Sequence, residues 1–332
     1  ISVNHISAGY GGKQVLKDVS ISFESGQLTG IIGPNGCGKS TLLKCIYRLL
    51  SPWSGDIQIG DTVLKDLPYR ESAKRVAVLA QHHAAGFDFD VEEVVLMGRT
   101  PYKGITEGNN REDRDIAHRA MQETGVETLA EQSFSFLSGG EQQRVAIART
   151  LSTGPRILLM DEPLSNLDAK LRMEMRSELK RLHMETDSTF VYVTHDQLEA
   201  MTLATKISLM KKGVLQQYAP PLTIYKEPAN AFVADFIGNP NINLVPVNVR
   251  EAGEKELVLA LDAHTLTFAA REAVQTKTGD KLLLGIRPEH VTIDPSGTIE
   301  AKVYSALPSG METVVKLDVG GFLLTSVVFG DV

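Results

Sequence analysis

The stretch GPNGCGKST, residues 33–41, decides the fold of this 332-residue chain. It fits the pattern G-x-x-x-x-G-K-[ST], in which glycines let backbone N–H groups turn inward around phosphate groups. The lysine adds a positive charge, and the serine hydroxyl can ligate Mg²⁺. The pattern therefore predicts a phosphate-binding loop. The residues expected to surround a nucleotide are Gly33, Pro34, Asn35, Gly36, Cys37, Gly38, Lys39, Ser40 and Thr41.

The flanking sequence supports this interpretation. LTGII, residues 28–32, is typical of a buried strand, and STLLKCIYRLL, residues 40–50, has apolar residues at the three- and four-residue spacing of a helix. Pro52 and Gly55 then end the helix. Strand, glycine loop and helix occur in the order that the motif requires, which disfavours a chance glycine turn.

A second acidic element follows another apolar run. RILLMDEP, residues 156–163, reads as a strand that ends in Asp161 and Glu162. Adjacent carboxylates at a strand end are costly unless they face a cation or water. We expect Asp161 to help hold Mg²⁺ and Glu162 to polarise an attacking water. A solvated acidic turn would be the better interpretation of this pair only without the phosphate loop.

The chain divides into two regions with different sequence patterns. Strand-like runs at 76–80, 156–160 and 189–195 alternate with helical patterns, which predicts an α/β domain over residues 1–238 with a helical subdomain at about 85–150. GNPNINLV, residues 238–245, resembles a linker. Beyond it come short alternating strands, which predict an all-β domain over residues 239–332.

Composition narrows the class of protein. The content of 42% hydrophobic and 23% charged residues fits a globular protein, and a formal charge of −7 disfavours a nucleic-acid partner. No apolar run approaches the roughly 18 to 20 residues of a membrane span, and ISVNHISAGY lacks the features of a secretion signal. Only two cysteines are present, Cys37 and Cys45, so we expect reduced thiols and a cytoplasmic location.

LSGGEQQR, residues 137–144, resembles the signature motif of ABC ATPases. The resemblance extends over about 240 residues and implies a P-loop NTPase that uses ATP and Mg²⁺. Tyr10 then resembles the aromatic that stacks on adenine, and Gln81 the glutamine that senses Mg²⁺ and the membrane partner. Asp168 in SNLD matches the dimer-contact loop, and His195 in VTHD the histidine at the γ-phosphate.

Taken alone, these residues have ordinary interpretations. Tyr10 would be a surface aromatic, Gln81 a polar residue at a strand end, and His195 a structural histidine. Their order and context favour the functional interpretation. The adjacent His82 and His83 lack further ligands at metal-binding spacing, and Cys37 stands at a free position of the motif, so we assign these three no catalytic role.

The resemblance also implies an assembly. Ser138, Gly139, Gly140 and Glu141 open a helix whose N–H groups form an anion site, yet the family fold places them far from their own phosphate loop. We therefore expect a head-to-tail homodimer or heterodimer of ATPase subunits that sandwiches ATP. Integral membrane permease subunits, and indirectly a solute-binding protein, would be its partners on the inner face of the cell membrane.

The cargo is ambiguous, because the two halves resemble different branches of the family. Residues 33–55, the run from Gln81 to His83 and VEEVVLMGRTPY resemble ATPases of ferric-siderophore, haem and vitamin B12 importers. MDEPLSNLDAKLR, THDQLEAM, FIGNPNINLV and GIRPEHV resemble those of sugar and glycerol-phosphate importers. A natural recombinant or an engineered fusion would each explain the mosaic.

The appended domain ranks the alternatives. Sugar-importer ATPases of the maltose type carry a C-terminal regulatory OB-like domain, and Arg287, Pro288, Glu289 and His290 match a motif found there, so carbohydrate or glycerol-phosphate import is favoured. The last strand lies directly before residue 331, so we expect this domain to stop short of its usual end.

Two other classes are disfavoured. A soluble ABC ATPase outside transport usually shows long coiled-coil inserts or tandem cassettes, and this sequence shows neither. A non-hydrolysing regulator is disfavoured because Lys39, Asp161, Glu162 and His195 are all present.

Overall fold

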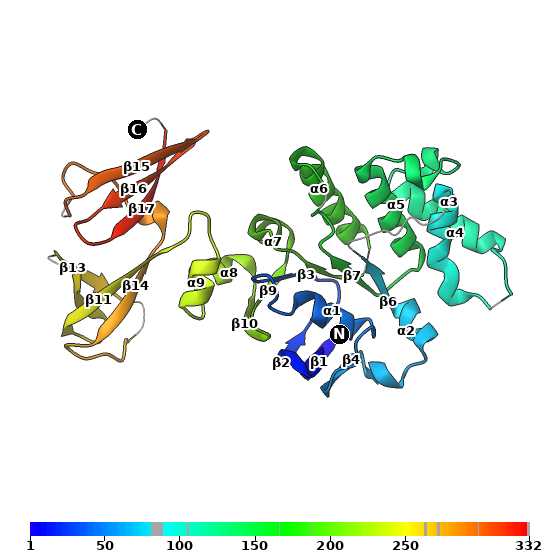
Figure 1. Ribbon diagram of the computed structural model, residues 1–332, viewed down its shortest axis with the longest axis horizontal. Coiled ribbons are helices and arrows are strands. Elements are labelled where there is room, and N and C mark those ends of the chain that lie inside the picture. The colour runs from blue at the N-terminus through cyan, green and yellow to red at the C-terminus, as the bar shows by residue number, and fades with distance from the viewer. Residues whose placement is uncertain are drawn as a thin grey trace. The chain divides into compact units, whose positions relative to one another are not determined.

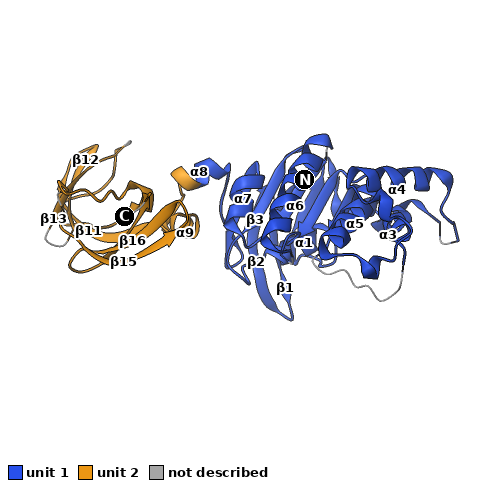
Figure 2. Cartoon of the chain, turned by 90° about the horizontal axis from the view of Figure 1, so that it is seen from above, with its two compact units in different colours: residues 1–224 blue, residues 225–332 orange. Residues whose placement is uncertain are grey.

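The computed structural model describes residues 1–80, 89–104, 106–165, 167–186, 188–261, 264–270, 273–297 and 299–330. The chain forms two compact units, Ile1–Ile224 and Tyr225–Val332 (Figure 2). Residues 225–238, which we expected to close the first domain, are grouped with the second unit. The described residues contain no helix long and apolar enough to cross a membrane.

A six-stranded sheet forms the centre of the first unit, in the order β10-β9-β3-β8-β7-β6 (Figure 1). Neighbours from β9 through β6 are parallel, and β10 is antiparallel to β9. All residues of β3 and β8 are buried, as expected for aliphatic strands covered on both faces. The strands are β3 (Leu28–Ile32), β6 (Val76–Leu79), β7 (Ile157–Asp161), β8 (Thr189–Val193), β9 (Lys206–Lys211) and β10 (Val214–Ala219).

The parallel arrangement determines where the functional motifs meet. The phosphate loop leaves the carboxyl end of β3, Asp161 ends β7, and His195 follows β8 by two residues. Because parallel strands end at the same edge of a sheet, all three lie at one edge.

A second sheet packs against the first helix. It has the order β2-β1-β4-β5 and is antiparallel, with bulges between β1 and β2. Helix α1 (Lys39–Ile46) contributes Leu42, Leu43 and Ile46, each 0% exposed, to a core shared by both sheets. The strands are β1 (Ser2–Tyr10), β2 (Lys13–Ser22), β4 (Ser54–Ile59) and β5 (Thr62–Val63), followed by η1 (Leu64–Asp66) and α2 (Tyr69–Arg75).

A helical subdomain gathers beyond the β6 edge of the sheet, as expected (Figure 1). Its helices share a hydrophobic core of their own, which includes Val95, Ala117 and Val145. The buried Arg99 pairs with the buried Asp113 at 3.0 Å and links two of these helices. The elements are α3 (Val91–Leu96), η2 (Met97–Tyr102), α4 (Arg111–Glu123), η3 (Glu127–Leu129), η4 (Phe134–Phe136) and α5 (Gly139–Ser152).

Two further helices complete the first unit. Helix α6 (Ala169–Glu185) follows β7, and α7 (Gln197–Leu203) follows β8. Met175, Leu179 and Leu182 are the buried residues of α6, at helical spacing. Helix α8 (Pro221–Lys226) lies at the boundary between the units.

The second unit contains α9 (Ala231–Phe236) and two antiparallel sheets, β13-β12-β11-β14 and β15-β16-β17. Both sheets contribute alternate residues to one core, among them Val247, Leu259 and Val315. The strands are β11 (Asn243–Ala252), β12 (Glu256–Leu261), β13 (His264–Ala269), β14 (Lys281–Ile286), β15 (Lys302–Ser309), β16 (Glu312–Asp318) and β17 (Leu323–Phe329).

The sequence motifs of this unit have structural roles. The linker expected at 238–245 is too long, because β11 begins at Asn243, whose side chain bonds two neighbouring strands. Arg287 is buried, donates to the carbonyl oxygens of Tyr225 and Ala234, and stacks on the Tyr225 ring at 4.1 Å. Pro288 starts η5 (Pro288–His290), and Glu289 accepts a hydrogen bond from the Tyr225 hydroxyl.

Candidate nucleotide-binding site

The phosphate loop requires glycine at two positions. Gly33 has φ 147° and Gly38 has φ 108°, which are backbone conformations that other residues rarely adopt. A Cβ atom at Gly33 would lie 2.2 Å from the Met210 carbonyl oxygen, and one at Gly38 would lie 2.8 Å from Leu16 Cδ2. The loop backbone therefore packs tightly on its inner side, while Pro34, Asn35 and Gly36 are exposed on the other.

The loop closes around the side chain of Lys39. Its ammonium group donates to the carbonyl oxygens of Gly33 at 2.8 Å and Pro34 at 3.3 Å, and the residue is only 6% exposed. Helix α1 starts at Lys39 without any side-chain cap, so its first N–H groups can point to a ligand. A buried cation and an uncapped helix start together fit an anionic phosphate group.

Two oxygen ligands converge beside this loop. The Ser40 hydroxyl, on α1, donates a hydrogen bond of 3.0 Å to Asp161 Oδ1 at the end of β7. Burial raises the pKa of the Asp161 carboxyl, and the charge of Glu162 raises it further. A cation at this position would relieve the cost of the charged carboxylate. A hydroxyl and a carboxylate fit Mg²⁺, which typically takes one or two such ligands beside phosphate oxygens.

Glu162 has a strained backbone. Its φ of 50° lies in the left-handed region, and two hydrogen bonds stabilise this conformation. The Glu162 N–H donates to the Val193 carbonyl oxygen at 3.0 Å, and the Ser165 hydroxyl donates to the Glu162 carbonyl oxygen at 3.0 Å. Such conformations concentrate at functional sites, where they aim a side chain. The Glu162 carboxylate lies 3.4 Å from His195 Nδ1, and the His195 side chain is 59% exposed.

Tyr10 lies next to the same helix. It ends β1, is 47% exposed, and has its ring 5.7 Å from the ammonium group of Lys44 on α1. An exposed aromatic ring of this kind is suited to stack on a flat base.

The signature segment forms a second helix start. Ser138 caps α5 in a capping box with Glu141, whose carboxylate accepts from the Ser138 N–H at 2.8 Å and hydroxyl at 2.7 Å. These bonds lower the pKa of Glu141. Ser138 and Gly139 are exposed, and nothing lies within 4 Å of a Cβ at Gly139. Gly140 is buried, and a Cβ there would lie 2.6 Å from Leu171 on α6.

The structure brings several of the predicted residues together at one sheet edge. The Ser40–Asp161 pair and the Glu162–His195 pair meet there, because Asp161 and Glu162 are consecutive, and Lys39 directly precedes Ser40. The signature segment belongs to the separate core of the helical subdomain, because α5 packs on α3 and α4.

Gln81 lies outside the described residues, so its proposed role stays a prediction. Asp168 caps α6 by accepting from the Leu171 N–H at 2.9 Å, which is a structural role in addition to the one predicted.

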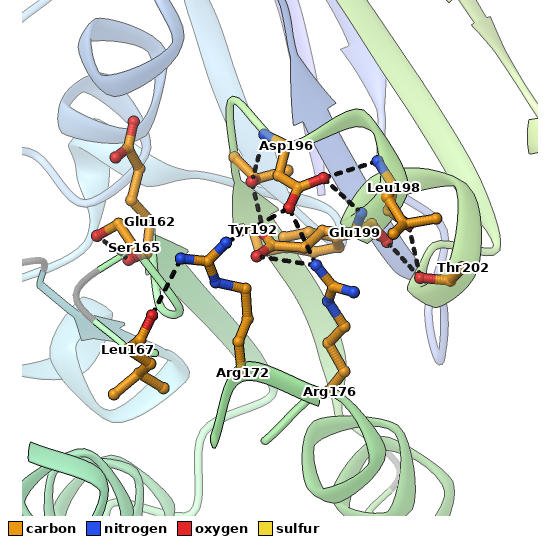
Figure 3. Close-up of polar contacts among 11 residues, drawn as sticks. Glu162, Ser165, Leu167, Arg172, Arg176, Tyr192, Asp196, Leu198, Glu199 and Thr202 are labelled. Carbon is orange, nitrogen blue, oxygen red and sulfur yellow. Dashed lines mark hydrogen bonds and ion pairs between the residues drawn. The ribbon is translucent and has the colours of Figure 1, made fainter. Parts of the chain in front are cut away.

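Sequence reasoning missed a charged cluster behind His195. Figure 3 shows Arg172 and Arg176 of α6 facing Asp196 and Glu199 at the start of α7. Together with Glu162, Ser165, Thr194 and His195, three of these four residues line a hollow of about 10 Å³. The four-residue spacing of the arginines was the available signal, since it places both on one helix face.

The phosphate loop with its buried Lys39, the Ser40–Asp161 pair and the capped signature helix fit an ATPase of the ABC class. Residues 16–165 match the family described as ABC transporter, and residues 238–291 match the MalK OB fold domain. The maltose/maltodextrin import ATP-binding protein MalK of Salmonella typhimurium is 37% identical over 323 residues, which cover 96% of this chain and 85% of that protein. The corresponding protein of Yersinia pestis is 36% identical over 324 residues, with the same coverage. The chain belongs to the family of ABC transporter ATP-binding proteins that includes these relatives.

Solved structures agree with this fold. cbiO1 of Clostridium perfringens, part of an ABC transporter complex, aligns with a TM-score of 0.61 and 26% identity over 69% of this chain and 91% of that chain. A putative metal-chelate type ABC transporter aligns with a TM-score of 0.62 and 23% identity, over 80% and 95% of the two chains, and supports the fold alone. The expected ABC ATPase fold and the C-terminal OB domain are confirmed.

Proposed function

We propose that this chain couples ATP hydrolysis to the import of a carbohydrate or glycerol-phosphate through separate membrane permease subunits. The observation that carries the proposal is the second unit, because residues 238–291 match the OB domain of maltose-type ATPases. The relatives named for maltose and maltodextrin import extend this similarity over 96% of the chain.

The proposed mechanism assigns each residue a task. Lys39 and the N–H groups of the loop hold the phosphates, while Tyr10 stacks on the adenine. Ser40 and Asp161 would hold Mg²⁺, which when bound would neutralise developing phosphate charge. Glu162 orients a water and accepts its proton, and its backbone strain fixes the direction of the carboxylate. His195, which is exposed and 3.4 Å from Glu162, reaches the γ-phosphate.

The proposed site is completed by a second subunit. Ser138 and Gly139 are exposed at the start of α5, yet α5 and α1 belong to different hydrophobic cores. A head-to-tail dimer would bring this helix start to the partner's phosphate loop. Closure would then assemble each site, and hydrolysis would release it and move the permease. We propose a peripheral position on the inner face of the cell membrane for this assembly.

Import of a ferric siderophore, haem or vitamin B12 is the second candidate. It is favoured by VEEVVLMGRTPY, which forms α3 and η2 and exposes Met97 and Tyr102 at 39% and 38%. This surface lies in the subdomain where the family contacts its permease.

Stimulation of ATPase activity by different solute-binding proteins separates the two candidates. The membrane subunits that copurify with the chain would be reconstituted in vesicles and supplied with ATP and their binding protein. We expect ATPase stimulation by a loaded sugar-binding protein and none by a ferric-siderophore carrier. The reverse pattern would establish the second candidate, and copurification with nucleic acid in place of membrane subunits would contradict both.

A further inference from the structure

The loop that carries Asp168 and the loop that carries His195 are bridged by one side chain. Arg172, on the first turn of α6, donates to the Leu167 carbonyl oxygen at 3.0 Å. Its other terminal nitrogen lies 3.9 Å from Asp196 Oδ2 (Figure 3). Arg172 therefore contacts the residue before Asp168 and the residue after His195.

Arg176, one helical turn further along, reinforces the second contact. It lies 3.0 Å from Asp196 Oδ2 and 3.7 Å from Glu199 Oε1. Glu199 is 3% exposed, and burial raises its pKa. Its position beside Arg176 offsets the cost of burying a carboxylate. The two arginines and two carboxylates balance in charge, and the Glu199 and Arg176 side chains are largely enclosed.

Asp196 determines the shape of the loop around His195. Its Oδ1 caps α7 by accepting from the N–H groups of Leu198 and Glu199, at 2.8 and 3.2 Å. Its own N–H donates to the Thr194 hydroxyl at 3.0 Å, and that hydroxyl donates to Glu199 at 2.6 Å. Hydrogen bonds therefore fix the positions of residues 194 and 196, which flank His195. A displacement of Asp196 would move the imidazole relative to Glu162.

We propose that Arg172 is a positioning residue that keeps the Asp168 loop and the His195 loop in register, so that closure at the subunit interface and alignment of His195 occur together. The inference rests on the proposed function, in which His195 reaches the γ-phosphate, and on the expected place of Asp168 in the dimer-contact loop. The Arg172 guanidinium lies between the two loops. It transmits position through the Leu167 carbonyl on one side and the Asp196 carboxylate on the other.

A purely structural role predicts a different result from a positioning role. Loss of a structural contact lowers stability and leaves the turnover of the folded fraction unchanged. Loss of a positioning contact lowers kcat, whereas the KM for ATP stays the same because Lys39 and the phosphate loop are untouched. Misplacement of a reacting group by about 1 Å costs up to roughly 100-fold in rate, so a measurable effect is expected.

The test measures MgATP hydrolysis by the full chain with Arg172→Met, and binding of a fluorescent ATP analogue. We expect kcat to fall roughly 10-fold or more, with KM and analogue affinity within about twofold of the parent. Arg172→Lys should recover part of the rate, because an ammonium can reach one of the two partners. Lys180→Met removes the same charge from an exposed position of α6 and should leave kcat unchanged.

Replacement of Asp196, the other side chain of this contact, gives a second test that does not depend on the Arg172 variant alone. Asp196→Asn keeps an oxygen to cap α7 but loses the ionic contacts with both Arg172 and Arg176, and should lower kcat with unchanged KM. Because Asp196→Asn already breaks the link that Arg172→Met removes, kcat of the double variant should fall no further than that of the slower single variant. Parental kcat in Arg172→Met, or effects that multiply in the double variant, would overturn the inference. If Arg172→Met does not fold, the Arg172→Lys and Asp196→Asn pair decides in the same way.

Failure of the proposed function would look different. An inactive parent chain, or Glu162→Gln at the parental rate, would contradict the hydrolytic assignment itself. A dead Glu162→Gln variant beside a fully active Arg172→Met variant would refute the positioning role alone.

Discussion

Replacement of Asp113 by alanine should destabilise the helical subdomain that presents the signature segment. Asp113 is 3% exposed and Arg99 is 7% exposed, with 3.0 Å between Asp113 Oδ1 and Arg99 Nε. Lys103 lies 3.8 Å from the other carboxylate oxygen, which also accepts from the Asn110 N–H at 3.2 Å. The substitution therefore leaves a buried guanidinium without its carboxylate.

The magnitude follows from these contacts. Removal of one partner of a buried ion pair costs about 3–5 kcal/mol. Arg99 keeps its bond to the Ser152 carbonyl at 2.8 Å and its stacking on Tyr102 at 4.0 Å, which favours the lower end. Loss of the Asn110 hydrogen bond adds about 1 kcal/mol. We therefore expect the free energy of unfolding to fall by about 3–4 kcal/mol at neutral pH.

The loss should also depend on pH. Burial alone raises the pKa of Asp113, but the Arg99 and Asn110 hydrogen bonds and the Lys103 charge lower it overall. A lowered pKa in the folded state gives stability that is present above the ordinary aspartate pKa and disappears as the pH falls through the folded value. The difference between parent and variant should shrink on acidification below about pH 4.

Urea denaturation followed by far-ultraviolet circular dichroism measures the effect. Asp115→Ala is the matched control, because this aspartate is exposed on the same helix and should change the free energy of unfolding by less than about 0.5 kcal/mol. A loss below about 1 kcal/mol for Asp113→Ala, typical of an exposed pair, would refute the reasoning.

Three further predictions concern the nucleotide site. Lys39→Ala should abolish measurable ATP binding in equilibrium dialysis, because it removes the buried cation of the loop, and unchanged affinity would contradict the phosphate-loop assignment. Glu162→Gln should bind ATP normally but lose roughly 100-fold or more in kcat, so parental turnover would remove Glu162 from its role. Gly38→Ala should weaken ATP binding at least roughly tenfold, since φ 108° and Leu16 both oppose a Cβ; calorimetry that gives parental affinity would disprove this requirement.

Local patterns made much of the site predictable. The phosphate loop and the acidic pair at 161–162 each follow an apolar strand, and the parallel topology brings the ends of β3, β7 and β8 to one edge. The signature helix was predictable because Ser138 and Glu141 form a capping box within four consecutive residues.

Contacts between distant segments were not predictable in the same way. The link from Arg172 to Asp196 joins residues on different helices, and its geometry depends on how α6 and α7 pack. The strain at Glu162 depends on the Val193 carbonyl of a neighbouring strand. Arg287 was predicted from a motif, but its role at the end of α9 appears only in the folded chain.

Disulfide cross-linking between subunits tests the sandwiched nucleotide most directly. Asn35→Cys lies on the exposed side of the phosphate loop and Ser138→Cys at the exposed start of α5, while the native Cys37 and Cys45 are each only 2% exposed. In a Glu162→Gln background, the account predicts that MgATP produces an oxidised dimer joined between Cys at 35 and Cys at 138, which is absent with MgADP. Failure to form this dimer with MgATP, in a variant that demonstrably binds ATP, would contradict the shared site.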